Sequence, residues 1–354
     1  MKKEHILVIR FSAMGDVAMT VPVVYSLATQ YPDIRITVLS RNFARPFFEG
    51  LAPNVSFMEA DVKTEYRGVK GLNTLYRRLV AKQFTKVADL HNVLRSEYLR
   101  LRFNMGRYRV EHINKHRSQK RSLTTAHHKV FKQLPTSFQN YADVFAKLGY
   151  PVKVQFKSIF PEEGGDMNLL PSSIGQKAAD EQWIGIAPTA AHRAKEYPME
   201  KMKEVIRLLT ENYPKARLFL FGRGQREERL FKEWCQQFTQ CLSVDSHLEK
   251  LQQELILMSH LDVMVSMDSA NMHLASLTAT PVVSVWGATH PYAGFMGWNQ
   301  SEENAVQTEL NCRPCSIYGN RLCKRGDLAC LNNIKPELVF NKINFLLTNK
   351  NRNV

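Results

Sequence analysis

Long apolar stretches are missing from this chain of 354 residues. No run of about 18 apolar residues occurs, so a membrane-spanning helix is excluded on length. Cysteine is scarce, with six in the whole chain, which argues against a disulfide framework. Repeats of fixed period and low-complexity tracts are also missing, and an apolar content of 44% excludes global disorder. The length is typical of two domains of ordinary size.

Acidic residues are too few to balance the basic ones, because 48 Lys and Arg face 33 Asp and Glu and the net charge is +15. This excess points to a polyanionic partner such as nucleic acid, an anionic membrane face or a phosphorylated substrate. The basic start is similar to that of a signal peptide. However, Arg10 and Asp16 interrupt its apolar stretch and no cleavage site follows. We therefore expect a cytoplasmic protein.

Short apolar runs alternate with segments of helical periodicity in two successive blocks, which predicts the α/β class with parallel, doubly wound sheets. The expected strands cover residues 6–9, 36–39, 87–90, 183–187, 218–221, 263–266 and 282–285. A helix is expected over residues 17–28, with Pro22 as its flaw, and another over 202–209. Prolines and glycines cluster between Phe160 and Ala178, so the joint between the two blocks is expected there.

Polar segments with little glycine follow several of these strands, at the edge where ligands of parallel sheets bind. The first is RFSAMGDV, which places Asp16 at a helix start and lacks the GxGxxG of dinucleotide sites. A carboxylate there can face a substrate, or it can merely charge the helix N-terminus. The second is PTAAHRAKEYP, whose hydroxyl and basic groups suit a diphosphate, although an ordinary basic loop is equally compatible.

The third segment is SMDSANMHLA, in which small residues open a helix whose N-terminus can bind an anion. His273 lies about one turn into that helix and can reach the same anion or can be a buried core residue. Together with the later segment WGATHP, the order of these motifs resembles glycosyltransferase family 9, the ADP-heptose:lipopolysaccharide heptosyltransferases, over residues 5 to 340.

The resemblance implies a GT-B fold, in which two Rossmann-like domains face each other. The expected ranges are 1–165 for the acceptor-binding domain, 178–335 for the donor-binding domain and 336–354 for a C-terminal helix and tail. It implies that Asp16 is the general base and that seven residues bind the donor: Thr189, Lys195, Glu227, Asp268, Ser269, Ala270 and His273. Glu228 is a near alternative to Glu227. Ser12, Arg95 and Arg121 are the expected acceptor-binding residues. Ala270 for glycine and His290 for the frequent aspartate depart from the family pattern.

The implied reaction is inverting transfer of a sugar, heptose by family default, from ADP-heptose to a hydroxyl of the lipopolysaccharide core. Asp16 would accept the hydroxyl proton, while Lys195 and the helix start near Ser269 would stabilise the departing diphosphate. No Asp-x-Asp motif occurs, so we expect a metal-independent enzyme that requires no cofactor for catalysis.

Basic residues dominate the segment from Arg95 to Lys132, where only Glu97 and Glu111 oppose them. We interpret this segment as a surface of the N-terminal domain that meets a phosphorylated glycolipid and the anionic inner face of the cytoplasmic membrane. A solvated helix face is the simpler alternative. Peripheral association with that membrane is the expected localisation.

Four cysteines, Cys312, Cys315, Cys323 and Cys330, are compact enough for a structural zinc site, although the second pair lacks the CxxC spacing. Free thiols are the alternative. A basic, zinc-containing nucleic-acid-binding protein and a GT-B enzyme such as an epimerase remain the alternative functions, but no nucleic-acid motif is present and no such partner is expected.

Overall fold

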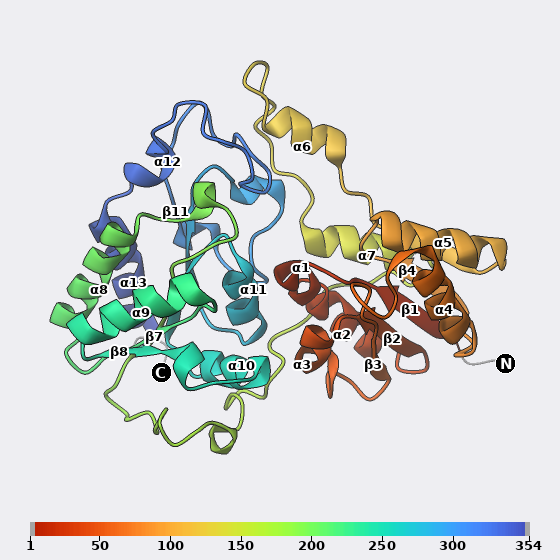
Figure 1. Cartoon of the computed structure of the whole chain (residues 1–354), viewed down its shortest axis with the longest axis horizontal. Coiled ribbons are helices and arrows are strands. Elements are labelled where there is room, and N and C mark those ends of the chain that lie inside the picture. Colours follow the sequence, from red (N-terminus) through yellow and green to blue (C-terminus); the bar gives the residue numbers. More distant parts are fainter. Residues whose placement is uncertain (1–3, 351–354) are drawn as a thin grey trace. The chain divides into compact units, whose positions relative to one another are not determined.

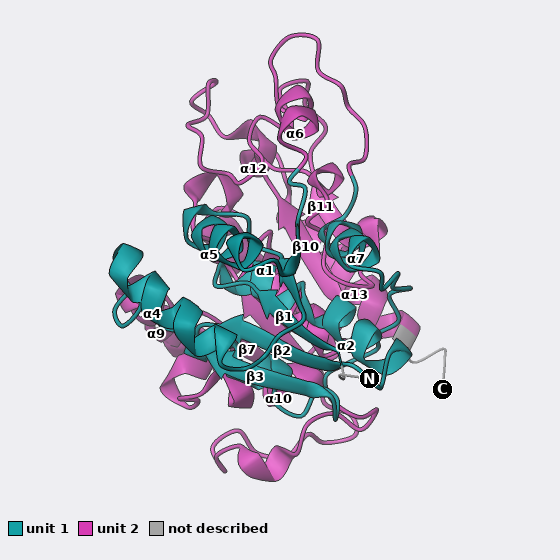
Figure 2. Cartoon of the chain, turned by 90° about the vertical axis from the view of Figure 1, so that its right-hand side faces the viewer, with its two compact units in different colours: residues 1–115, 135–159 teal, residues 116–134, 160–354 magenta. Residues whose placement is uncertain are grey.

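The computed structural model describes residues 4–350, which form two compact units (Figure 1). Unit 1 contains residues up to 115 together with 135–159. Unit 2 contains residues 116–134 and everything from 160 onwards (Figure 2). Within residues 4–350, none of the helices has both the length and the apolar character needed to cross a membrane.

Unit 1 is built on a five-stranded sheet in the order β3-β2-β1-β4-β5, and every pairing in it is parallel. Its strands are β1 (His5–Ile9), β2 (Arg35–Ser40), β3 (Val55–Glu59), β4 (Lys86–Asp89) and β5 (Arg109–His112). Its α-helices are α1 (Met14–Ala18), α2 (Val21–Gln30), α3 (Arg45–Phe48), α4 (Gly68–Val80), α5 (Leu94–Met105) and α7 (Ser137–Lys147).

Unit 2 contains a six-stranded, wholly parallel sheet in the order β11-β10-β9-β6-β7-β8. Its strands are β6 (Trp183–Ala187), β7 (Arg217–Leu220), β8 (Cys241–Ser243), β9 (Val263–Met267), β10 (Val282–Trp286) and β11 (Ala305–Gln307). Its α-helices are α6 (Arg117–Leu123), α8 (Met199–Asn212), α9 (Gln225–Gln237), α10 (Leu251–Ser259), α11 (Ala270–Leu277), α12 (Ala329–Asn332) and α13 (Pro336–Lys350).

Both strand orders reverse direction at one point, which locates the edge where a ligand binds in each unit. In unit 1 the reversal lies between β1 and β4, and in unit 2 between β6 and β9. Loops that leave the carboxyl ends of two such strands diverge to opposite sides of the sheet and open a crevice between them. The segments after β1, β6 and β9 are the three that the sequence singled out, and the loop after β4 completes the pair in unit 1.

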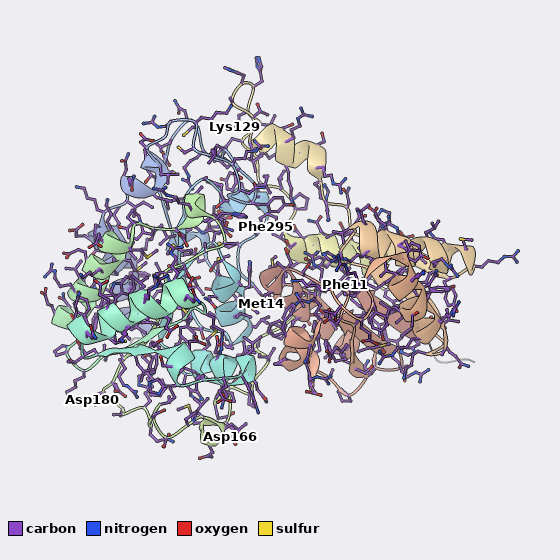
Figure 3. All side chains as sticks on the ribbon, viewed as in Figure 1. Phe11, Met14, Lys129, Asp166, Asp180 and Phe295 are labelled. Atoms are coloured by element: carbon purple, nitrogen blue, oxygen red, sulfur yellow. The ribbon has the colours of Figure 1, made fainter. Side chains whose placement is uncertain are left out.

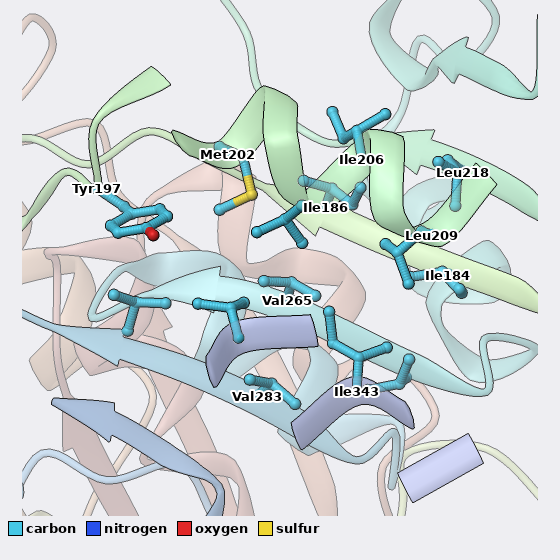
Figure 4. Close-up of a cluster of buried hydrophobic side chains, with 14 of the residues drawn as sticks. Ile184, Ile186, Tyr197, Met202, Ile206, Leu209, Leu218, Val265, Val283 and Ile343 are labelled. Atoms are coloured by element: carbon cyan, nitrogen blue, oxygen red, sulfur yellow. The ribbon is translucent and has the colours of Figure 1, made fainter. Parts of the chain in front are cut away.

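Apolar side chains from both faces of each sheet form the cores. In unit 2, Ile184, Val265 and Val283 of the central strands pack against Met202 of α8 and Ile343 of α13 (Figure 4). The C-terminal helix, predicted as a separate element of residues 336–354, is therefore part of this core, and residues 351–354 of the predicted tail lie outside the described residues. Because the strands are covered on both faces, they read as continuous apolar runs.

The structure differs from the sequence-based expectations at two places. The helix expected over residues 17–28 is two helices, because Pro22 lies in the first turn of α2, where its missing N–H costs nothing. The expected ranges 1–165 and 178–335 also differ from the observed units. Residues 116–134 pack with unit 2, and so does the whole connecting segment from residue 160.

Candidate functional site

The loop after β1 is organised by Arg10, a buried residue of the first motif to which the sequence assigned no role. The Arg10 guanidinium donates to the carbonyl of Leu90 at 2.6 Å and to that of Ser12 at 2.9 Å. Its Nη2 forms an ion pair with Asp16 Oδ2 at 2.8 Å. Arg10 thus ties the loops after β1 and β4 to each other and fixes the carboxylate at the crevice of unit 1.

Asp16 combines both roles considered for it from sequence. Its Oδ2 accepts the N–H of Ala13 at 3.2 Å, which is the interaction expected of a carboxylate in the first turn of α1. Its side chain is nevertheless 34% exposed, whereas that of Arg10 is almost fully covered. A hydroxyl group can therefore approach the carboxylate, and the guanidinium holds it in one orientation.

His91 is a second residue of this crevice that the motifs did not reveal. Its Nδ1 accepts the backbone N–H of Phe11 at 3.5 Å, which leaves Nε2 as the hydrogen-bearing atom near Ser12 Oγ at 3.4 Å. Burial, assisted by the nearby Arg10 cation, lowers the pKa of His91 to about 3. A neutral imidazole therefore positions Ser12, one of the predicted acceptor-binding residues. The only sequence signal was a polar Asp-Leu-His at the end of a predicted strand.

In unit 2, the loops after β6 and β9 bring Lys195 and Asp268 together. Lys195 Nζ lies 2.9 Å from Asp268 Oδ2, and the two side chains are only 16% and 5% exposed. The carboxylate oxygen is buried and makes no aligned hydrogen bond, so the attraction rests on charge. The Lys195 ammonium is therefore a cation held at this edge of the sheet, and such a group suits a diphosphate through charge-assisted hydrogen bonds.

Helix α11 begins beside this pair with an N-terminus that no side chain caps. Ser269 is the N-cap residue, and its hydroxyl lies near that of Ser266 at 3.3 Å instead of accepting a helix N–H. Ala270 is the first helical residue and His273, which is buried, is the fourth. The free N–H groups and the helix dipole favour an anion here. The structure therefore brings the predicted Lys195, Asp268, Ser269 and Ala270 to one crevice.

The loop that carries Thr189 and Lys195 is held by an ion pair that the motifs did not predict. Glu196 Oε1 accepts the N–H of Ala190 at 3.0 Å. Both oxygens of Glu196 are in turn bound by Arg226 of α9 at 2.8 and 2.9 Å. This bidentate pair fixes the shape of the loop and links it to the start of α9.

The structure distinguishes Glu227, expected to bind the donor, from its alternative Glu228. Glu227 folds back over the loop after β7, so that a Cβ added to Gly222 or Gly224 would approach its side chain closely. Glu228 instead lines a cavity near β8 together with Lys232 and His247. Since ligands bind at strand carboxyl ends, the geometry favours Glu227 as the donor-facing residue.

The family model described as glycosyltransferase family 9 (heptosyltransferase) matches residues 72–325. The chain belongs to this family. It is 24% identical to lipooligosaccharide heptosyltransferase 2 of Haemophilus influenzae over 365 aligned positions, covering 97% of this chain and 99% of that protein.

Two solved structures share the fold at 18% identity. One is the ADP-heptose lps heptosyltransferase II of E. coli, with a TM-score of 0.69 and coverage of 98% and 99% of the two chains. The other is a family 9 glycosyl transferase from Veillonella parvula, with a TM-score of 0.72 and coverage of 99% and 98%. The predicted α/β class and GT-B architecture are confirmed, and the protein is a glycosyltransferase.

The acceptor-binding residues expected in this glycosyltransferase do not lie on one unit. Ser12 and Arg95 belong to unit 1, whereas Arg121 is an exposed residue of α6 in unit 2. The basic segment from Arg95 to Lys132, interpreted as one surface of the N-terminal domain, is divided in the same way after Lys115. The physical reason is that residues after 115 find their packing partners on the loops that follow β10.

Arg313 holds the segment WGATHP in place. It is buried and donates to the carbonyls of Gly287 at 2.6 Å and Thr289 at 2.9 Å. His290, at the position of the frequent aspartate, packs its ring against Tyr292 at a centroid distance of 4.6 Å. Burial lowers the pKa of His290 to about 4, and the Arg313 cation adds to that effect. His290 is thus a neutral packing residue.

The cysteine-containing loop approaches the donor crevice through Gly319. This glycine has a φ of +75°, and a Cβ there would overlap with Cγ and Cδ of Lys195. Among residues 4–350, no three His, Cys, Asp or Glu side chains are arranged to hold a metal ion. Burial also raises the pKa of the Cys330 thiol to about 11. Structural zinc at Cys312, Cys315, Cys323 and Cys330, and the free thiols that are its alternative, stay predictions.

Proposed function

We propose that this glycosyltransferase transfers heptose, with inversion, from ADP-heptose to a hydroxyl of a lipopolysaccharide core or a related phosphorylated glycolipid. The observation that carries the proposal is the presence of complementary groups at the two crevices. Unit 1 presents an oriented carboxylate, Asp16, and unit 2 presents the Lys195 ammonium beside the open start of α11. The name of the similar E. coli enzyme, ADP-heptose lps heptosyltransferase II, supports ADP-heptose as the donor.

In the proposed reaction, Asp16 accepts the proton of the acceptor hydroxyl while that oxygen attacks the anomeric carbon. The bond from the anomeric carbon to the diphosphate oxygen breaks in the same step, and the electron pair leaves with ADP. Lys195 and the N–H groups of Ser269 and Ala270 stabilise the charge that develops on the diphosphate. A single displacement inverts the anomeric configuration, so a second catalytic carboxylate is not required.

The second part of the proposal concerns the acceptor. Ser12, Arg95 and Arg121 are proposed to bind the acceptor, with the two arginines suited to its phosphate groups. We also propose that the enzyme works in the cytoplasm at the inner face of the membrane, where a lipid-linked acceptor is accessible, and that the transfer is independent of metal ions. The charge of +15 supports an anionic partner.

The test is Asp16→Asn, with Asp33→Asn as a control that removes an exposed carboxylate elsewhere in unit 1. We expect Asp16→Asn to lower kcat by about 100-fold or more, since a general base contributes roughly that much, while binding of ADP-heptose changes little. Transfer is followed by release of ADP, and the anomeric configuration of the product by NMR. Near-normal turnover in Asp16→Asn, or retention of configuration, would contradict the proposed mechanism.

A further inference from the structure

Two segments of unit 2 that lie far apart in sequence form one projecting surface, named here the paired-loop surface: residues 117–132 and residues 318–325. Lys129 joins them, because its Nζ donates to the carbonyl of Asn311 at 3.1 Å, of Arg313 at 2.7 Å and of Pro314 at 3.2 Å. Lys129 is labelled in Figure 3. The first segment is therefore seated on the chain that leads into the second.

Contacts between an ammonium group and aromatic rings also connect the two segments. The Lys120 ammonium of α6 lies 4.4 Å from the ring centroid of Phe295 and 5.9 Å from that of Tyr318. Figures 1 and 2 both show α6 and the loop that precedes α12 at the same end of unit 2. The two segments thus point in one direction and can meet one partner together.

Apolar side chains stand exposed on this surface. Leu322 is 95% exposed, and Val130, Phe131 and Tyr318 are 56%, 53% and 51% exposed. The Phe131 ring contacts that of Tyr292 at a centroid distance of 4.8 Å, and the Tyr318 ring contacts that of Phe295 at 5.8 Å, yet about half of each residue stays exposed. Exposed apolar groups gathered at one place mark a contact site for a protein or a membrane.

The charge around these tips has one sign. Residues 117–132 contain five Lys and Arg and no acidic residue, and residues 318–325 contain three Lys and Arg and no acidic residue. The exposed cations beside the apolar tips are Arg117, Arg121, Lys132, Arg321 and Lys324. Asp327, the first carboxylate after the second segment in sequence, is paired with Arg325 at 2.9 Å. The surface is therefore suited to a partner that is anionic outside and apolar beneath.

We propose that the paired-loop surface binds an anionic lipid bilayer. Leu322, Val130 and Phe131 enter the boundary between headgroups and acyl chains, and the surrounding cations contact lipid phosphates. Aliphatic tips distinguish this partner from nucleic acid, because Leu322 and Val130 cannot stack on bases. The inference deepens the proposed function, on which its biological use rests: it assigns the membrane contact to unit 2 and to named residues.

The experiment is co-sedimentation of the full chain with vesicles of phosphatidylcholine alone or with about one third phosphatidylglycerol. We expect binding to the anionic vesicles only, weakened by added salt. Arg321→Gln with Lys324→Gln should lower the partition coefficient by about 25-fold, at about fivefold for each cation near the surface. Lys232→Gln with Lys335→Gln, which removes two exposed cations elsewhere on unit 2, is the matched control and should change it little.

The apolar part is tested with Val130→Ser and Leu322→Ser, which should weaken binding without changing the charge. In Leu322→Trp, emission should be quenched by brominated acyl chains in anionic vesicles. Equal binding of the Ser variants, absence of that quenching, or preference for a short DNA duplex over anionic vesicles would overturn the proposal. Transfer to a delipidated, soluble acceptor separates the two ideas. If wild type lacks transfer but binds vesicles, the proposed function fails and this inference stands.

Discussion

Replacing Lys195 by methionine tests the donor crevice most directly. Methionine keeps an aliphatic stem that can lie against Gly319 but removes the ammonium. A hydrogen bond to a charged group contributes about 1.5–3 kcal/mol, so the Kd for ADP should rise by roughly 10- to 150-fold. The buried Asp268 carboxylate is left without its partner and repels the diphosphate, which places the expected loss at the upper end of that range.

Asp268 also allows the effect on stability to be separated from the effect on binding. Removing one partner of a buried ion pair destabilises a fold by up to about 3–5 kcal/mol, and the 16% exposure of Lys195 reduces this. Lys195→Met should therefore lower the Tm without ligand, and adding Asp268→Asn should restore most of it. The Kd is measured by calorimetry with ADP, and Lys232→Met serves as the control. A Kd for Lys195→Met within twofold of wild type would refute the assignment.

Three further changes test the supporting residues. Arg226→Gln should raise the Kd for ADP severalfold with little change in Tm, because only the clamp on Glu196 and its loop is lost; an unchanged Kd would show that the loop holds its shape alone. Gly319→Ala should weaken ADP binding, since a Cβ displaces the Lys195 stem, whereas Gly326→Ala, with open space around its Cβ position, should not. The pKa of His91 is about 3 in the folded chain, against an ordinary value of 6.5. Between pH 6.5 and pH 3 the unfolded state therefore binds one more proton than the folded state, and the free energy of unfolding falls as the pH falls. At pH 5 this amounts to about 2 kcal/mol, and His91→Gln should show a smaller fall in Tm from pH 7 to pH 5 than wild type; equal falls would contradict the assigned burial.

The sequence predicted most accurately the strands whose residues are apolar throughout. Central strands such as Trp183–Ala187 are covered on both faces and are apolar throughout, so they were located almost to the residue. The edge strand Arg109–His112 was not predicted, because it is short and polar and contains no apolar run. The general rule for parallel sheets likewise located the two segments after β6 and β9 at one edge of the sheet, and the family resemblance named Lys195 and Asp268 within them.

The remaining features depend on long-range contacts that periodicity does not contain. Arg10 reads as an interruption in an apolar strand, and only the folded chain shows that it binds the Leu90 carbonyl and Asp16. Residues 116–134 follow unit 1 in sequence, yet Leu123 and Leu134 bury their side chains against Ala293 of unit 2. No local pattern states which of two cores a connecting segment will join.

A series of direct contacts connects the donor crevice with the paired-loop surface. Gly319, which bounds the Lys195 stem, is only three residues from Leu322 at the tip of the second loop. Lys129 of the first loop holds the backbone at Arg313, and Arg313 holds the loop of Gly287, which in turn lies against the Ala194 carbonyl next to Lys195. Both loops are thus connected by direct contacts to positions within a few residues of the ammonium. Because linkage is reciprocal, any effect of an anionic bilayer on ADP affinity has to appear equally as an effect of ADP on bilayer affinity.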